Sequence, residues 1–182
     1  MSAWTRVRYR VTQFGQWILD SMRPLDLAYA RKRLPTPELV ALFTRMSRAD
    51  QHHSITVAQA LERQGYHNPD LIAAALLHDV GKSRVRMSVW ARVMVVLGEW
   101  LVPEAAHQWS RAEAKGLRRP FVVRHRHAAW GAEMTSQAGA SGTTVRLIRN
   151  HHKAIDTETD AEVALRMETR RLLAALQASD DE

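Results

Sequence analysis

Histidines are unusually frequent and unevenly placed in this chain. Nine occur in 182 residues, and seven of them fall at positions 52–53, 78, 125–127 and 151–152. Imidazole and carboxylate groups bind divalent iron, manganese and zinc. The chain has no cysteine, so disulfides and thiolate metal sites are excluded and any metal must use His, Asp or Glu. The clustering therefore indicates a metal site.

Two residues with metal-binding side chains, His78 and Asp79, are adjacent at the end of an apolar stretch. The stretch 71–78 is apolar on nearly every side of a helix, which predicts burial. Burying an imidazole and a carboxylate without partners costs several kcal/mol, and a bound cation removes that cost. Gly81 is predicted to permit a sharp exit of the chain. Lys82, three residues after Asp79, is predicted to share its face and to offer an ammonium group to a phosphate oxygen.

The elements that position these side chains are predicted to be helices, because apolar residues recur at intervals of three and four. Thr36-Pro37 and Asn68-Pro69 indicate helix starts, and Gly65 indicates a helix end. The predicted helices are residues 4–22, 25–34, 37–46, 51–64, 71–78, 88–101, 104–114, 121–138, 143–152 and 161–179. Residues 115–120 are predicted to form a basic loop. No strand pattern of useful length appears, so the predicted fold is all-α.

Length and composition favour one globular bundle. The apolar fraction of 46% excludes wholesale disorder, and residues 36–182 are predicted to form the main domain, with residues 1–35 as an N-terminal helical extension. The most apolar stretch, 89–102, is too short to span a bilayer and contains Arg92 and Glu99. No signal peptide is visible, so the expected location is the cytoplasm.

The arrangement H…HD…D, with the segment AALLHDVGK at its centre, resembles the HD superfamily of metal-dependent phosphohydrolases over roughly residues 48–180. The resemblance implies a single helical HD-domain bundle that binds one or two divalent ions, iron, manganese or similar. Its implied ligands are His53, followed by Val57 as in the motif HxxxV, the pair His78 and Asp79, and Asp180 near the chain's end. Asp181 is the alternative closing ligand.

A second part of the pattern is similar to the HD-GYP branch of that superfamily. His127 precedes Gly131-Ala132-Glu133 as in the motif HPxxGAE, and His151-His152 match the motif HHE, but the GYP tripeptide is missing. This implies a binuclear site, whereas the missing GYP argues against cyclic-di-GMP phosphodiesterase activity. Helical HD enzymes that cleave dinucleoside polyphosphates are the better match in size. Successive helical residues point about 100° apart, so His151 and His152 are not both expected to approach one ion from a straight face. His152 is either a direct ligand or a group that contacts the substrate or orients a ligand.

The resemblance implies hydrolysis of a phosphoester or phosphoanhydride bond in a small nucleotide-like substrate by a metal-activated water. Asp79 would bridge two cations about 3.5–4 Å apart, and Lys82 would neutralise charge on the phosphoryl oxygens. The basic run before His127 is interpreted either as a solvated face or as a substrate-binding surface. On the second interpretation, the residues that bind the substrate are Arg118, Arg119 and Arg124.

The net charge of +7 suits a polyanionic ligand. The alternative function is therefore a non-catalytic, metal-ordered module that binds a signalling nucleotide or, less favoured, nucleic acid. A membrane-surface protein is a third interpretation, supported only by charge and one apolar helix. The oligomeric state is left open.

Overall fold

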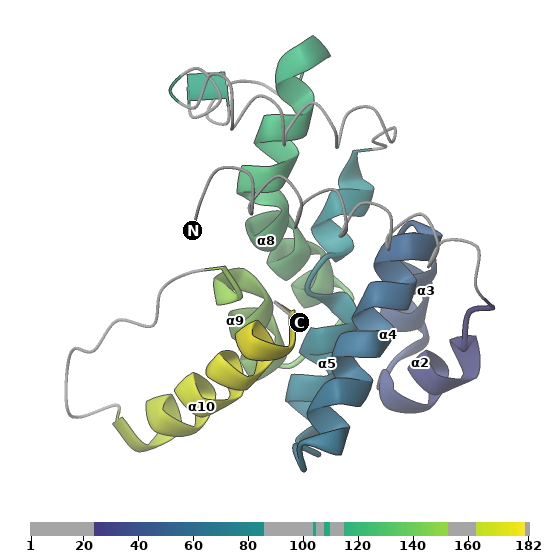
Figure 1. Cartoon of the computed structure of the whole chain (residues 1–182), viewed down its shortest axis with the longest axis vertical. Helices are drawn as coiled ribbons and strands as arrows, with labels where there is room; N and C mark the ends of the chain where they lie inside the picture. Colours follow the sequence, from purple (N-terminus) through teal and green to yellow (C-terminus); the bar gives the residue numbers. More distant parts are fainter. Residues whose placement is uncertain (1–23, 86–103, 105–107, 110–114, 153–162, 181–182) are drawn as a thin grey trace, which may run out of the picture.

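The computed structural model describes residues 24–85, 104, 108–109, 115–152 and 163–180, and the side chains of the last segment from Arg171 onward. All regular structure in these residues is helical, which confirms the all-α prediction (Figure 1). The predicted helices at 4–22 and 88–101, and most of 104–114, lie outside the described residues. The helices are α2 (Leu27–Arg33), α3 (Pro37–Thr44), α4 (Arg48–Arg63), α5 (Pro69–Leu77), η1 (Val80–Arg84), η2 (Gly116–Arg118), α8 (Arg119–Gln137), α9 (Gly142–Asn150) and α10 (Val163–Asp180).

The helix starts follow from side chains that cap free backbone N–H groups. The Thr36 hydroxyl accepts a hydrogen bond from the Leu39 N–H at 3.2 Å, and Asn68 Oδ1 caps α5 in the same way. Helix α4 begins at Arg48, three residues before the predicted start, because the Ser47 hydroxyl caps it. Gly65, with a φ of 86°, ends that helix as predicted.

Helix α5 lies at the centre of the bundle. It packs against α4, α9, α10, α2 and α3, and every residue from Leu71 to Leu77 is buried. This confirms the predicted buried helix and explains why its sequence is apolar all round. His78 is the C-cap of α5 and is fully buried, so the end of this helix places its imidazole in the interior of the protein.

The region before the long helix α8 differs from the prediction. Residues 115–120 do not form a loop throughout, because Gly116–Arg118 is a turn of 3-10 helix (η2) and α8 already begins at Arg119. Pro120 fits the first turn of α8, where its missing N–H has no helical partner to lose. Among the helices so described, none has the length and apolar character needed to cross a membrane.

Gly81 has a different role from the predicted one, because it does not adopt the left-handed conformation. A Cβ atom at Gly81 would lie 1.9 Å from the backbone oxygen of His127 and 2.7 Å from the Gly131 nitrogen. A Cβ at Gly131 would in turn lie 3.3 Å from the Gly81 nitrogen. The two glycines thus let the backbones of η1 and α8 touch, and this contact brings Asp79 to His127.

Candidate metal centre

Five imidazoles and two carboxylates converge from helices α4, α5, α8, α9 and α10 on one buried region. Each ring centroid lies 4.0–5.4 Å from that of a neighbouring imidazole. The structure therefore brings together all the residues that the sequence predicts as metal ligands. They are His53, His78, Asp79, His127, His151, His152 and Asp180.

Three buried imidazoles are oriented by the same kind of local hydrogen bond to the backbone. The Nδ1 of His78, His127 and His151 lies 2.8, 2.8 and 2.6 Å, respectively, from the carbonyl oxygen three residues earlier. Since a carbonyl only accepts, each Nδ1 carries a proton and donates it, so that in the neutral imidazole the lone pair is on Nε2. His78 and His151 are the C-caps of α5 and α9, where the last carbonyls have no helical partner. Backbone bonds of this kind orient metal-binding histidines.

The Nε2 atoms of His78 and His151 are buried and have no hydrogen-bond partner. The His78 Nε2 lies 3.1 Å from Asp180 Oδ1, so in the neutral imidazole two acceptors face each other. Such an arrangement is unfavourable unless a cation or a proton lies between the two atoms. A donor set of nitrogen and oxygen atoms without sulfur fits divalent iron, manganese or zinc.

One group consists of His53, His78 and Asp79, whose ligand atoms all lie within 4.8 Å of one another. Asp180 joins it, because its Oδ1 lies 2.7 Å from His53 Nε2 and 3.1 Å from His78 Nε2. Ligands bound at right angles about 2.1 Å from an ion are themselves about 3 Å apart, so these spacings suit coordination. Asp181, the alternative closing ligand, lies outside the described residues.

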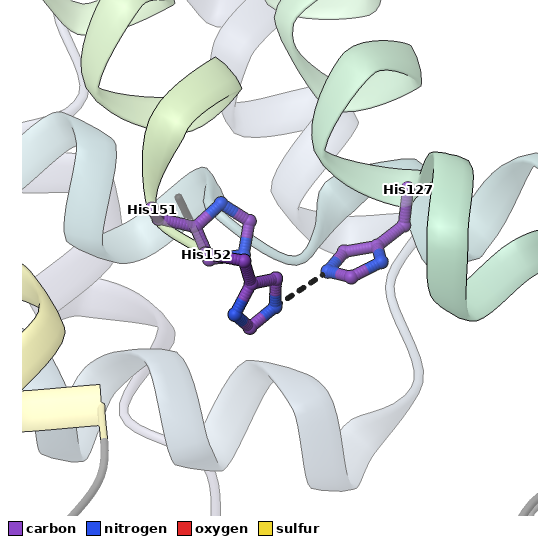
Figure 2. Close-up of side chains that lie close together, drawn as sticks. All are labelled: His127, His151 and His152. Atoms are coloured by element: carbon purple, nitrogen blue, oxygen red, sulfur yellow. Dashed lines mark hydrogen bonds between the residues drawn. The ribbon is translucent and has the colours of Figure 1, made fainter. Parts of the chain in front are cut away.

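The second group consists of His127, His151 and His152, whose ligand atoms also lie within 4.8 Å of one another (Figure 2). The Nε2 atoms of His127 and His152 are 3.1 Å apart. The prediction that His151 and His152 would not both approach one ion assumed a continuing straight helix. That assumption is wrong, because α9 ends at Asn150 and the two ring centroids lie only 4.0 Å apart.

Asp79 stands between the two groups. Its Oδ1 lies 3.5 Å from His127 Nε2, whereas its Oδ2 lies 3.6 Å from His78 Nε2 and forms an ion pair with Lys82. This ion pair confirms that Lys82 shares the face of Asp79. Burial opposes the charge on Asp79, but Lys82 and His78 hold the pKa of its carboxyl well below the usual range. The carboxylate is therefore ionised and available to both groups.

The same electrostatics set the protonation of the histidines. Burial alone would lower the pKa of His78, but Asp180 and Asp79 outweigh it and raise that pKa to about 9 in the metal-free protein. Burial, reinforced by Lys82, lowers the pKa of His127 to about 4. Burial and His78 lower the pKa of His151 to about 3. His127 and His151 are therefore neutral at pH 7, in the form that binds metal.

These shifts predict that the metal-free protein loses stability as the pH falls from about 6.5 to about 4.5. In that window the unfolded chain protonates His127 and His151 and the folded one does not, so the free energy of unfolding falls by up to about 1.4 kcal/mol per pH unit for each residue. The raised pKa of His78 contributes stability that is fully present below 6.5 and is lost only as the pH rises through about 9. Denaturant unfolding in chelator at several pH values measures the slope.

The matched variants are His127→Gln and His151→Gln, each of which should flatten that pH dependence. A free energy of unfolding that stays constant between pH 6.5 and 4.5 in the metal-free wild type would contradict the burial of two neutral imidazoles.

The predicted substrate-binding arginines precede His127 on α8 or at its N-cap, and Arg124 lies about one helical turn before His127. Arg118, Arg119 and Arg124 are exposed, and the first two lie at the start of that helix, about two turns before His127. Arg84, which follows Lys82, donates to Glu133 at 2.7 Å. The sequence did not indicate this pair or the contact of Gly131 with Gly81; a glycine within a helix, four residues after His127, was the available signal.

A family model described as HD domain matches residues 51–180, which is more than half of the chain and runs from just before His53 to Asp180. No curated protein and no solved structure matches the chain significantly.

Proposed function

The chain belongs to the HD domain family, and on this premise we propose that it is a metal-dependent phosphohydrolase. Its reaction would be the hydrolysis of a phosphoester or phosphoanhydride bond in a small nucleotide-like substrate. The observation that carries the proposal is the pair of side-chain groups that meet at Asp79, with buried imidazole Nε2 atoms turned toward them.

Each group would hold one divalent ion, iron or manganese being the metals expected for this donor set. His53, His78 and Asp180 would hold the first ion and His127, His151 and His152 the second, with Asp79 shared. Divalent cations in such a site lower the pKa of a water and polarise a phosphoryl group.

Lys82 is the group best placed to bind the phosphate. Its side chain is about a quarter exposed, so it reaches from the buried carboxylate of Asp79 to solvent. An ammonium group has three N–H donors, and one can remain on Asp79 while the others contact phosphoryl oxygens. Lys82 would thereby stabilise the negative charge that develops on those oxygens.

The exposed arginines of α8 would attract the anionic substrate. We predict that Arg118→Ala combined with Arg119→Ala raises KM more than it lowers kcat, because these residues lie about two helical turns from His127 and act on binding. The control, Arg45→Ala with Arg63→Ala, removes the same charge from α4 and the end of α3. Steady-state assays at low salt measure KM. An unchanged KM in the first variant would show that the basic residues before His127 are a solvated face and do not bind the substrate.

The direct test is phosphate and nucleotide release from a panel of mononucleotides, cyclic dinucleotides and dinucleoside polyphosphates, with protein reconstituted in manganese or ferrous iron. Turnover on one member supports the hydrolase. The charge of +7 and the basic start of α8 favour one second candidate, a metal-ordered nucleotide- or nucleic-acid-binding module. Metal binding and tight ligand binding without turnover would support that module instead.

A further inference from the structure

A cluster at the edge of the metal centre has no part in the function proposed so far. Arg84 of η1 lies over Trp130 of α8, with its guanidinium carbon 5.4 Å from the ring centroid. The same guanidinium donates to Glu133 at 2.7 Å. Arg84 and Glu133 are about half exposed and Trp130 is partly exposed, so solvent reaches the cluster.

This cluster is close to the groups expected to bind phosphate and metal. Trp130 follows His127 by three residues, so the two side chains are neighbours on the surface of α8. Arg84 follows Lys82 by two residues in η1. Both halves of the Arg84–Trp130 pair are thus within about one helical turn of residues that face the metal centre.

The chemistry of the cluster suits a flat, aromatic ligand. Nucleobases stack on tryptophan rings and on the planes of guanidinium groups. The ion pair with Glu133 is exposed and therefore contributes little stability, so Arg84 can adjust its position around a base at small cost. Glu133 offers a carboxylate that accepts hydrogen bonds from a base amino group.

We propose that Trp130 and Arg84 form the nucleobase-binding position of this site, so that the substrate class is a nucleotide and not a base-free phosphoester. The inference rests on the proposed function, because it places the phosphate of the same ligand at Lys82 and the metal groups. A base on Trp130 would fix the orientation of that phosphate.

The test compares the affinities of the manganese-reconstituted full chain for AMP and for ribose 5-phosphate, which differ only in the base. We expect AMP to bind roughly tenfold more tightly, within the range of base–aromatic stacking. Trp130→Leu should abolish this preference by lowering the affinity for AMP and not that for ribose 5-phosphate. Trp130→Phe, which keeps an aromatic face, should retain most of the preference. Helical circular dichroism establishes that both variants fold.

Equal affinities in the wild type, no binding of either compound, or an AMP preference that survives in Trp130→Leu would each overturn the inference. The proposed function fails by a different result. A Trp130-dependent preference for AMP in a protein that hydrolyses no phosphoester would leave the base-binding position standing and refute the hydrolase.

Discussion

Replacement of Asp79 by alanine is expected to remove bound metal and to lower kcat/KM by on the order of a thousandfold or more, the size of effect seen when a central catalytic group is deleted. The reason is positional: each oxygen of this one carboxylate faces a different histidine group. The helical fold should survive, because Lys82, the ion-pair partner of Asp79, is partly exposed and its ammonium can be hydrated.

Two further variants make this experiment specific. Asp79→Asn keeps the size of the side chain and removes its charge, so it should lose metal to nearly the same extent. Glu38→Ala removes an exposed carboxylate in the first turn of α3 and should change neither metal content nor turnover. Metal analysis, circular dichroism and steady-state kinetics are the readouts, and full turnover in Asp79→Ala would contradict the proposed role of this residue.

Gly81→Ala is expected to have the second large effect, a loss of at least about 3 kcal/mol in the free energy of unfolding. The new methyl group would lie 1.9 Å from a backbone oxygen of α8, and a backbone atom in a packed helix cannot move aside as a flexible side chain can. Relief requires η1 and α8 to separate, which would also move Asp79 from His127 and weaken metal binding.

Gly142→Ala is the matched control, because a Cβ there would meet only the end of the Arg146 side chain at 3.8 Å. Its free energy of unfolding should stay within about 0.5 kcal/mol of the wild type. Denaturant titrations of both variants measure the difference, and equal stabilities would show that the contact between η1 and α8 is not as close as the structure has it.

Much of the fold was predictable because its signals are local. The caps Thr36 and Asn68 and the apolar stretch that ends at His78 depend on neighbours in the sequence, and each prediction is confirmed. The family pattern likewise identified the side chains that meet at the centre. What the sequence did not reveal depends on contacts between distant segments: the packing of Gly81 on α8, and Arg84 pairing with Glu133.

The arrangement of the second histidine group shows most clearly what could not be predicted from the sequence. A rule for regular helices separated His151 from His152, and the rule fails because α9 ends at Asn150, two residues before the predicted end at His152. Assignments of helix ends differ by one or two residues even in known structures, and here a difference of two residues decides how many imidazoles face the centre.

The most direct test of the account is the metal content of the protein after anaerobic purification and reconstitution, compared with that of the His127→Ala/His151→Ala variant. If each histidine group binds one ion, the wild type should contain close to two equivalents of iron or manganese. The variant should contain close to one, because His53, His78, Asp79 and Asp180 remain. A wild-type protein that binds no divalent metal under these conditions would contradict the metal centre itself.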